Sequence, residues 1–124
     1  GTGGISATNY YGTKRKENLV ETLSVGRIVE YVLCEADVVQ INRRRLEGVG
    51  HGKDWPQGAQ AHVGNQASTG DVVPAIVVWP HHNEASTFNG QAFLDGNDVL
   101  WITSVPYNPT PTVLPRTWHW PTRV

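Results

Sequence analysis

The chain contains no methionine and a single cysteine, Cys34, among its 124 residues. One cysteine excludes an internal disulfide, and its position at the end of an apolar run favours a small buried side chain over a reactive thiol. The lack of methionine predicts that the initiator was removed or that the N-terminus was processed. No apolar stretch approaches the length of about 20 residues that a membrane-spanning helix needs, so we expect no membrane association.

An excess of charge of either sign is also missing. Ten Lys and Arg residues stand against 11 Asp and Glu residues, which gives a formal net charge of -1 at pH 7. No overall field therefore draws the protein toward nucleic acid or anionic lipid, and such binding would depend on a local patch. Hydrophobic residues make up 39% of the chain and charged residues 17%, a balance too apolar for disorder.

Motifs that would identify a catalytic or metal site are absent as well. No serine lies in a G-x-S-x-G elbow, and no Walker or dinucleotide-binding glycine loop is present. His81 and His82 are adjacent and would point to opposite faces of a strand, which does not match zinc-ligand spacing. Asp95 and Asp98 lack the rest of a calcium loop and are typical turn residues. We therefore expect a protein that is not an enzyme and that holds no metal and no cofactor.

What the sequence does contain is a series of β-branched and aromatic runs, which predict strands. The expected strands cover 26–33, 71–79, 88–94 and 99–105, with a further short strand within 117–120. Asp95-Gly96 between the third and fourth runs is a strong hairpin signal. Pro74 lacks a backbone N–H, so it predicts an edge position or a bulge in the second strand.

One short helix is expected at 37–46. Asp37 stands three residues before Gln40, which is a capping-box spacing, and Gly48 follows the end of the segment. Together these elements predict a mainly β fold, either a small SH3-like barrel or a strongly bent antiparallel sheet with one short helix.

The rest of the chain divides into an arm and a loop. Residues 1–24 lack a period of 2 or 3.6 and predict an extended N-terminal arm, followed by a single β domain at 25–124. Residues 48–70 hold six glycines and predict a long irregular loop within that domain. An arm of this composition frays when it is free, so we expect a neighbouring subunit to hold it.

Two basic clusters and several aromatic residues are candidates for contact with other subunits. The candidate contact residues are Tyr10, Tyr11, Lys14, Arg15, Lys16, Arg43, Arg44, Arg45 and Trp55. The two clusters also allow an alternative, a barrel that binds nucleic acid. Three consecutive arginines on a helix fan over roughly 200° at about 100° per residue, so they do not all serve one groove, and nucleic acid is the weaker hypothesis.

Five tryptophans allow a second alternative. Trp118 and Trp120 lie on the same side of an extended segment, where paired indoles are able to stack on a sugar, so a glycan- or cell-surface-binding module stays open. The proline-rich tail at 106–121 is expected to be an extended strap. Packing of this strap explains the same pair, because each indole buries a large apolar area.

Several motifs in order also resemble a family of small proteins encoded by tailed bacteriophages. The resemblance spans residues 25–121 and rests on segments 26–33 (GRIVEYVL), 41–45 (INRRR), 64–65 (GN), 70–78 (GDVVPAIVV), 93–98 (FLDGND), 101–104 (WITS) and 117–121 (TWHWP). The family is thought of as virion-associated or accessory, and it supplies no catalytic residue. The resemblance therefore implies a virion structural protein, with a capsid or decoration component expected first. We expect it to contact neighbouring subunits through its arm and loops. Its expected partners are the major capsid protein or copies of itself, in a homo-oligomer or a lattice.

Overall fold

The computed structural model describes residues 22–51, 62–83, 86–110 and 112–122, with backbone alone at 48–51. The arm expected at 1–24 lies outside the described residues except for its last three positions. The middle of the loop expected at 48–70 lies outside them as well. The strands, the helix and the hairpin expected from the sequence all fall within the described part of the chain.

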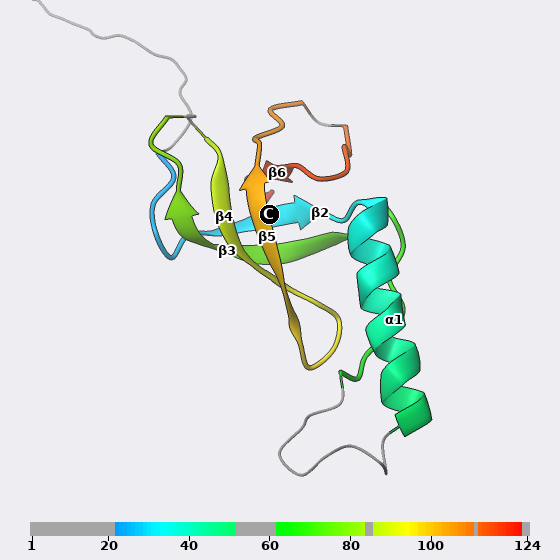
Figure 1. Cartoon of the computed structure of the whole chain (residues 1–124). Helices are drawn as coiled ribbons and strands as arrows, with labels where there is room; N and C mark the ends of the chain where they lie inside the picture. Colours follow the sequence, from blue (N-terminus) through cyan, green and yellow to red (C-terminus); the bar gives the residue numbers. More distant parts are fainter. Residues whose placement is uncertain (1–21, 52–61, 84–85, 111, 123–124) are drawn as a thin grey trace, which may run out of the picture.

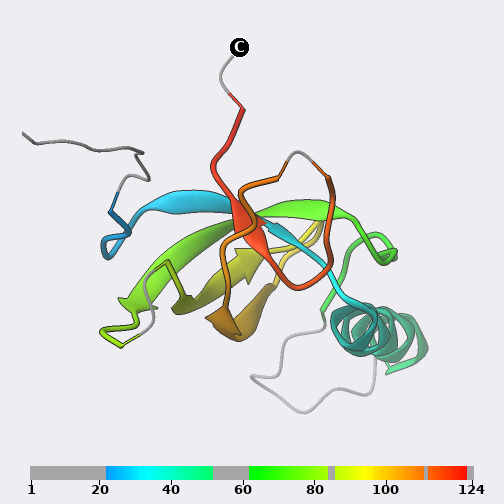
Figure 2. The ribbon, with the colours of Figure 1, turned by 90° about the horizontal axis from the view of Figure 1, so that it is seen from above.

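Five antiparallel strands form one sheet in the order β5-β4-β3-β2-β6 (Figure 1). The strands are β2 (Ile28–Val32), β3 (Val72–Pro80), β4 (Phe88–Phe93), β5 (Val99–Val105) and β6 (Trp118–His119). Their bounds lie within two residues of the expected ones. Seen from above, the sheet bends strongly and stays open (Figure 2). The expectation of a strongly bent sheet is confirmed, and the alternative of a closed SH3-like barrel is wrong.

The inner face of the sheet carries the hydrophobic core. Because side chains alternate between faces along a strand, the register places one row of small and aliphatic residues across four strands. This row consists of Val29, Ala75, Ala92 and Leu100, none more than 2% exposed. Trp118 of β6 is fully buried beside it and meets Phe88 edge to face, with ring centroids 6.1 Å apart. The indole N–H of Trp118 donates to the carbonyl of Ser86 at 2.7 Å, which satisfies its polar atom inside the core.

The segment that follows β5 runs beside β6. The Asn108 N–H donates to the Trp118 carbonyl at 2.9 Å, and the Trp118 N–H donates to the Pro106 carbonyl at 3.0 Å. An isolated parallel bridge joins Tyr107 to Trp118 at the same place. These contacts fasten the C-terminal strap to the sheet without completing a barrel.

Helix α1 (Glu35–His51) follows β2 directly and is longer than expected at both ends. Asp37 is not the residue that starts it. Its Oδ2 accepts the N–H of Cys34 at 3.0 Å, so Asp37 is the third helical residue and reaches back to the cap, as the acidic member of a capping box does. Gly48 lies inside the helix rather than after it, because one glycine lowers helix propensity by only about 1 kcal/mol.

Asp37 also links the helix to the sheet. Its Oδ2 accepts a hydrogen bond from the Tyr31 hydroxyl at 2.5 Å. Burial raises the pKa of Tyr31 well above its usual value, and the Asp37 carboxylate raises it further. Tyr31 therefore stays protonated and keeps donating this bond over the physiological pH range.

Pro74 lies in a central strand, not at an edge, and no bulge occurs there. It pairs with Glu30 of β2, while the paired positions between β3 and β4 begin one residue later, at Ala75. The bulge of β3 falls further along, between Val77 and Trp79. The missing N–H of Pro74 is tolerated because it faces the end of the ladder with β4.

Gly90 of β4 offers a test of how tightly the inner face is packed. A Cβ at this position would lie 2.1 Å from the Ile76 carbonyl oxygen and 2.7 Å from the Phe88 ring. We expect Gly90→Ala to lower the free energy of unfolding by about 1–3 kcal/mol, because a backbone carbonyl has little room to move. Urea denaturation measures the change, with Gln91→Ala on the other face of β4 as control. Equal midpoints for the two variants would contradict this close packing.

Candidate functional site

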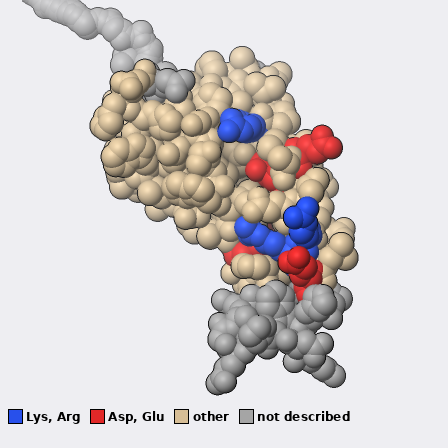
Figure 3. Space-filling view, in the orientation of Figure 1, with Lys and Arg blue, Asp and Glu red and all other residues tan. Residues whose placement is uncertain are grey.

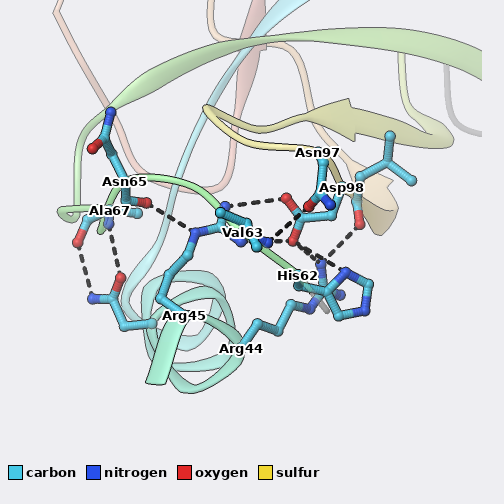
Figure 4. A network of polar contacts seen from close by, with 10 residues as sticks. Arg44, Arg45, His62, Val63, Asn65, Ala67, Asn97 and Asp98 are labelled. Atoms are coloured by element: carbon cyan, nitrogen blue, oxygen red, sulfur yellow. Dashed lines mark hydrogen bonds and ion pairs between the residues drawn. The ribbon is translucent and has the colours of Figure 1, made fainter. Parts of the chain in front are cut away.

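The predicted basic cluster on α1 turns inward at Arg45. This side chain is 5% exposed, and its guanidinium meets the Asp98 carboxylate with two bonds, Nη1 to Oδ2 at 2.9 Å and Nη2 to Oδ1 at 3.1 Å (Figure 4). Its Nε donates to the Asn65 carbonyl at 3.0 Å. A buried charge is stable only when it is paired and hydrogen-bonded, and Arg45 fulfils both conditions.

Arg44 joins the same carboxylate from the next position on the helix. Its Nη1 lies 3.0 Å from Asp98 Oδ2 and donates to the Val99 carbonyl at 2.9 Å. The His62 ring stands 3.7 Å from the same oxygen on the exposed side (Figure 4). The Arg44 and Arg45 side chains therefore bind the β4–β5 hairpin from one side.

The hairpin also holds the segment before β3. The Val63 N–H donates to Asn97 Oδ1 at 2.8 Å, and the Asn65 amide donates to Asp95 Oδ2 at 2.9 Å. Close approach is possible because Gly64 and Gly96 form a bridge in which a Cβ on Gly64 would lie 2.6 Å from the Gly96 Cα. Helix, hairpin and loop thus converge on Asp98.

Burial alone would raise the pKa of Asp98. The hydrogen bonds and positive charges of Arg45 and Arg44 outweigh that effect and hold the pKa below its usual value. Asp98 is therefore ionised at neutral pH and acts as a fixed acceptor between two guanidinium groups. We call this arrangement of Arg44, Arg45 and Asp98 the clasp. Its role is structural, because the guanidinium groups contact the carboxylate directly and leave no space for a substrate between the charges.

The structure sorts the expected contact residues into three groups. Arg44 and Arg45 are engaged within the chain, so they are not free for another subunit. Arg43 is exposed on α1. The others lie outside the described residues, namely Tyr10, Tyr11, Lys14, Arg15, Lys16 and Trp55.

The expected stacking pair is divided in the same way. Trp118 is fully buried and unable to stack on a ligand, which corrects the pairing of Trp118 and Trp120 as one platform. Trp120 is half-buried, packs edge to face on Trp118 with centroids 4.9 Å apart, and lies under the Arg27 guanidinium at 4.4 Å. Packing of the strap is thus the main role of Trp118.

An apolar surface that the sequence analysis did not single out lies on the outer face of the sheet. Six large hydrophobic side chains there are between 41% and 55% exposed: Ile28, Val78, Trp79, Phe93, Val99 and Trp101. We call this set the outer apolar face. Figure 3 shows charged residues gathered beside α1, while most of the surface over the sheet in that view carries none. Large exposed apolar surfaces of this kind mark sites of interaction.

Chemical groups for catalysis are sparse in the described part of the chain. No cluster of three or more His, Cys, Asp or Glu residues there could hold a metal ion. Cys34 is half-buried and free, and it serves as the backbone cap of α1. None of the described helices is long and apolar enough to cross a membrane.

Comparison with protein-family models, with curated proteins and with solved structures finds no match to this chain.

The clasp can be tested by removing the charge of Asp98. We expect Asp98→Asn to lower the free energy of unfolding by about 3–5 kcal/mol, because Arg45 is then buried without a counter-charge. The exposed Asp95→Asn is the matched control and should cost about 1 kcal/mol or less. Thermal and urea unfolding report both values, and similar losses in the two variants would argue against a buried clasp.

The clasp also predicts how stability depends on pH. Because the pKa of Asp98 is lower in the folded state, its contribution is present above the unfolded value of about 3.9 and is lost as the pH falls through the folded pKa. We expect the wild-type protein to lose more stability than Asp98→Asn between pH 5 and pH 2, roughly the range of this titration. Parallel pH profiles for the two proteins would contradict the assignment.

Proposed function

We propose that this protein is a non-enzymatic structural component of a bacteriophage virion, first of all a capsid or decoration protein, and that it contacts other subunits through the outer apolar face. The observation that carries the proposal is that face, together with the resemblance of segments 25–121 to proteins of tailed phages. The proposal places the protein in the virion, with the major capsid protein or further copies of itself as partners.

The register gathers four of the six residues of the outer apolar face into two neighbouring rows. One row runs from Ile28 through Ile76 and Gln91 to Trp101, and the next pairs Phe93 with Val99. Side chains in adjacent strands lie about 5 Å apart, so the members of each row form a continuous surface. Such a surface favours a flat, uncharged partner.

The free energy gained by covering this face is suited to a subunit that repeats the same contact many times in a lattice. Apolar area removed from water contributes roughly 25 cal/mol per Å², so each half-exposed aromatic side chain gains stability on being covered. A lattice sums many such contacts, which allows each one to be smaller than the interface of about 800 Å² per partner in an isolated stable pair. The outer apolar face is therefore suited to a subunit held at many points.

A nucleic-acid function has less support. Arg44 and Arg45 form ion pairs with Asp98, and Arg43 is the exposed member of that cluster. Phosphate binding needs several free cations, and it is strongly salt-dependent.

The experiment is particle incorporation. The wild-type protein should be found in purified particles by mass spectrometry, and the double variant Phe93→Gln/Trp101→Gln should be incorporated at least about tenfold less, which corresponds to a loss of about 1.4 kcal/mol in contact energy. Both side chains are about half exposed, so the variant should keep its unfolding temperature.

Leu46→Gln supplies the control. Leu46 lies on α1 and is 70% exposed, so it removes an exposed apolar side chain away from the sheet. Incorporation of the double variant at the level of Leu46→Gln would overturn the role of the face. Absence of the wild-type protein from intact particles would overturn the virion assignment.

A further inference from the structure

A pocket of ≈ 400 Å³ lies beneath the C-terminal strap, away from the clasp and distinct from the outer apolar face. It is bounded by residues 107–110, 112 and 113 of the strap, by β6 and the residues after it, and by Val72 at the start of β3. Pockets of this volume are within the range that holds small ligands.

The buried side chain of Asn108 cross-links the part of the strap that lines the pocket. Its amide donates to the Thr112 carbonyl at 2.8 Å, and its Oδ1 accepts both the Thr110 N–H at 3.1 Å and the Thr110 hydroxyl at 2.7 Å. Asn108 is 6% exposed. The strap is thereby fixed before any ligand arrives, which lowers the ordering cost of binding.

The hydroxyl protons of this network can be assigned. The Thr110 hydroxyl has one proton and gives it to Asn108, so the 2.8 Å contact between the Thr110 and Thr112 hydroxyls must use the Thr112 proton. Thr112 is exposed on the pocket wall, and its oxygen is left with free lone pairs. The strap thus presents an acceptor to whatever enters.

His119 also lines the pocket. Its Nε2 lies 2.9 Å from the Glu30 carboxylate, which assigns the proton to Nε2 and leaves Nδ1 with a lone pair when the ring is neutral. Two aromatic rings, Tyr107 and Trp120, provide apolar surface in the same wall. Among the described residues that line the pocket there is no Asp, Glu, Lys or Arg.

We propose that this pocket binds a neutral carbohydrate. A sugar ring combines hydroxyl donors, which meet the acceptors of Thr112 and His119, with an apolar C–H face, which packs on an aromatic side chain. The lack of Asp, Glu, Lys and Arg in the wall favours an uncharged sugar over a uronic acid or a sugar with a free amino group. A proline-rich peptide fits less well, because its carbonyls require donors and the indole N–H of Trp120 is buried.

Titration of the full-length protein with D-glucose, D-galactose and N-acetyl-D-glucosamine tests the proposal, with two-dimensional NMR of the tryptophan indole N–H groups as readout. At least one of these sugars should shift the Trp120 resonance and leave that of Trp101 unchanged. Thr112→Val keeps the side-chain shape and removes the acceptor, so it should raise Kd about fivefold to tenfold. Thr103→Val, on exposed β5, is the matched control and should leave Kd unchanged.

Three outcomes would overturn the proposal. The first is no shift with any of the three sugars at about 50 mM, a concentration at which even a Kd in the tens of millimolar gives a visible shift. The second is binding that Thr112→Val does not weaken. The third is displacement of the sugar, or binding at the same resonance, by a polyproline peptide with higher affinity. None of these outcomes bears on incorporation into particles, so the carbohydrate site and the virion role stand or fall separately.

Discussion

The placement of α1 depends on the buried ion pair between Arg45 and Asp98. Among the helix side chains that the structure describes, Ile41 and Arg45 are the buried ones, and they lie one turn apart. Ile41 packs into the hydrophobic core, whereas Arg45 fixes the orientation of the helix through two bonds to one carboxylate. Because a buried charge is costly without its partner, the hairpin that carries Asp98 and the helix that carries Arg45 stabilise each other's position. The loop at Asn65 joins through the same guanidinium.

Much of the fold could be predicted because its signals are local. Alternating β-branched residues and the Asp95-Gly96 turn placed the strands to within two residues. The open sheet could not be told from a barrel, since closure depends on how far β5 and β6 lie apart. The role of Arg45 could not be predicted either. Its partner, Asp98, lies 53 positions further along the chain, in a segment whose sequence is typical of a turn. The outer apolar face was missed because a strand pattern shows alternation without showing which face is covered.

The tryptophans show how one residue type divides between core and surface. Trp118 follows the alternation that buries its strand neighbour Tyr31, and it donates its indole N–H to a backbone carbonyl. Trp101 stands between buried Leu100 and Ile102 on β5, so it faces outward and remains about half exposed. The Trp118-x-Trp120 spacing predicted that both indoles share one side, yet the chain leaves the sheet after β6. Trp120 therefore lines the pocket under the strap while Trp118 lies in the core.

The edges of the sheet show which kind of contact remains open to a partner. The Leu94 N–H donates to the Asp98 carbonyl at the start of the β4–β5 ladder. Because hydrogen-bonded positions alternate along an antiparallel strand, the backbone groups of Val99, Trp101 and Thr103 point away from β4. The carbonyls of Val99 and Thr103 are occupied by Arg44 and Arg116, and the outer side of β6 is paired with the segment after β5. Exposed strand edges invite pairing with other chains. Here the backbone of β6 is paired on its outer side, and two carbonyls on the outer side of β5 are occupied by arginine side chains. Strand addition at β6 is therefore disfavoured, and at β5 the two arginine side chains stand in the way of a regular ladder. The outer apolar face offers a partner side-chain contact that needs neither edge.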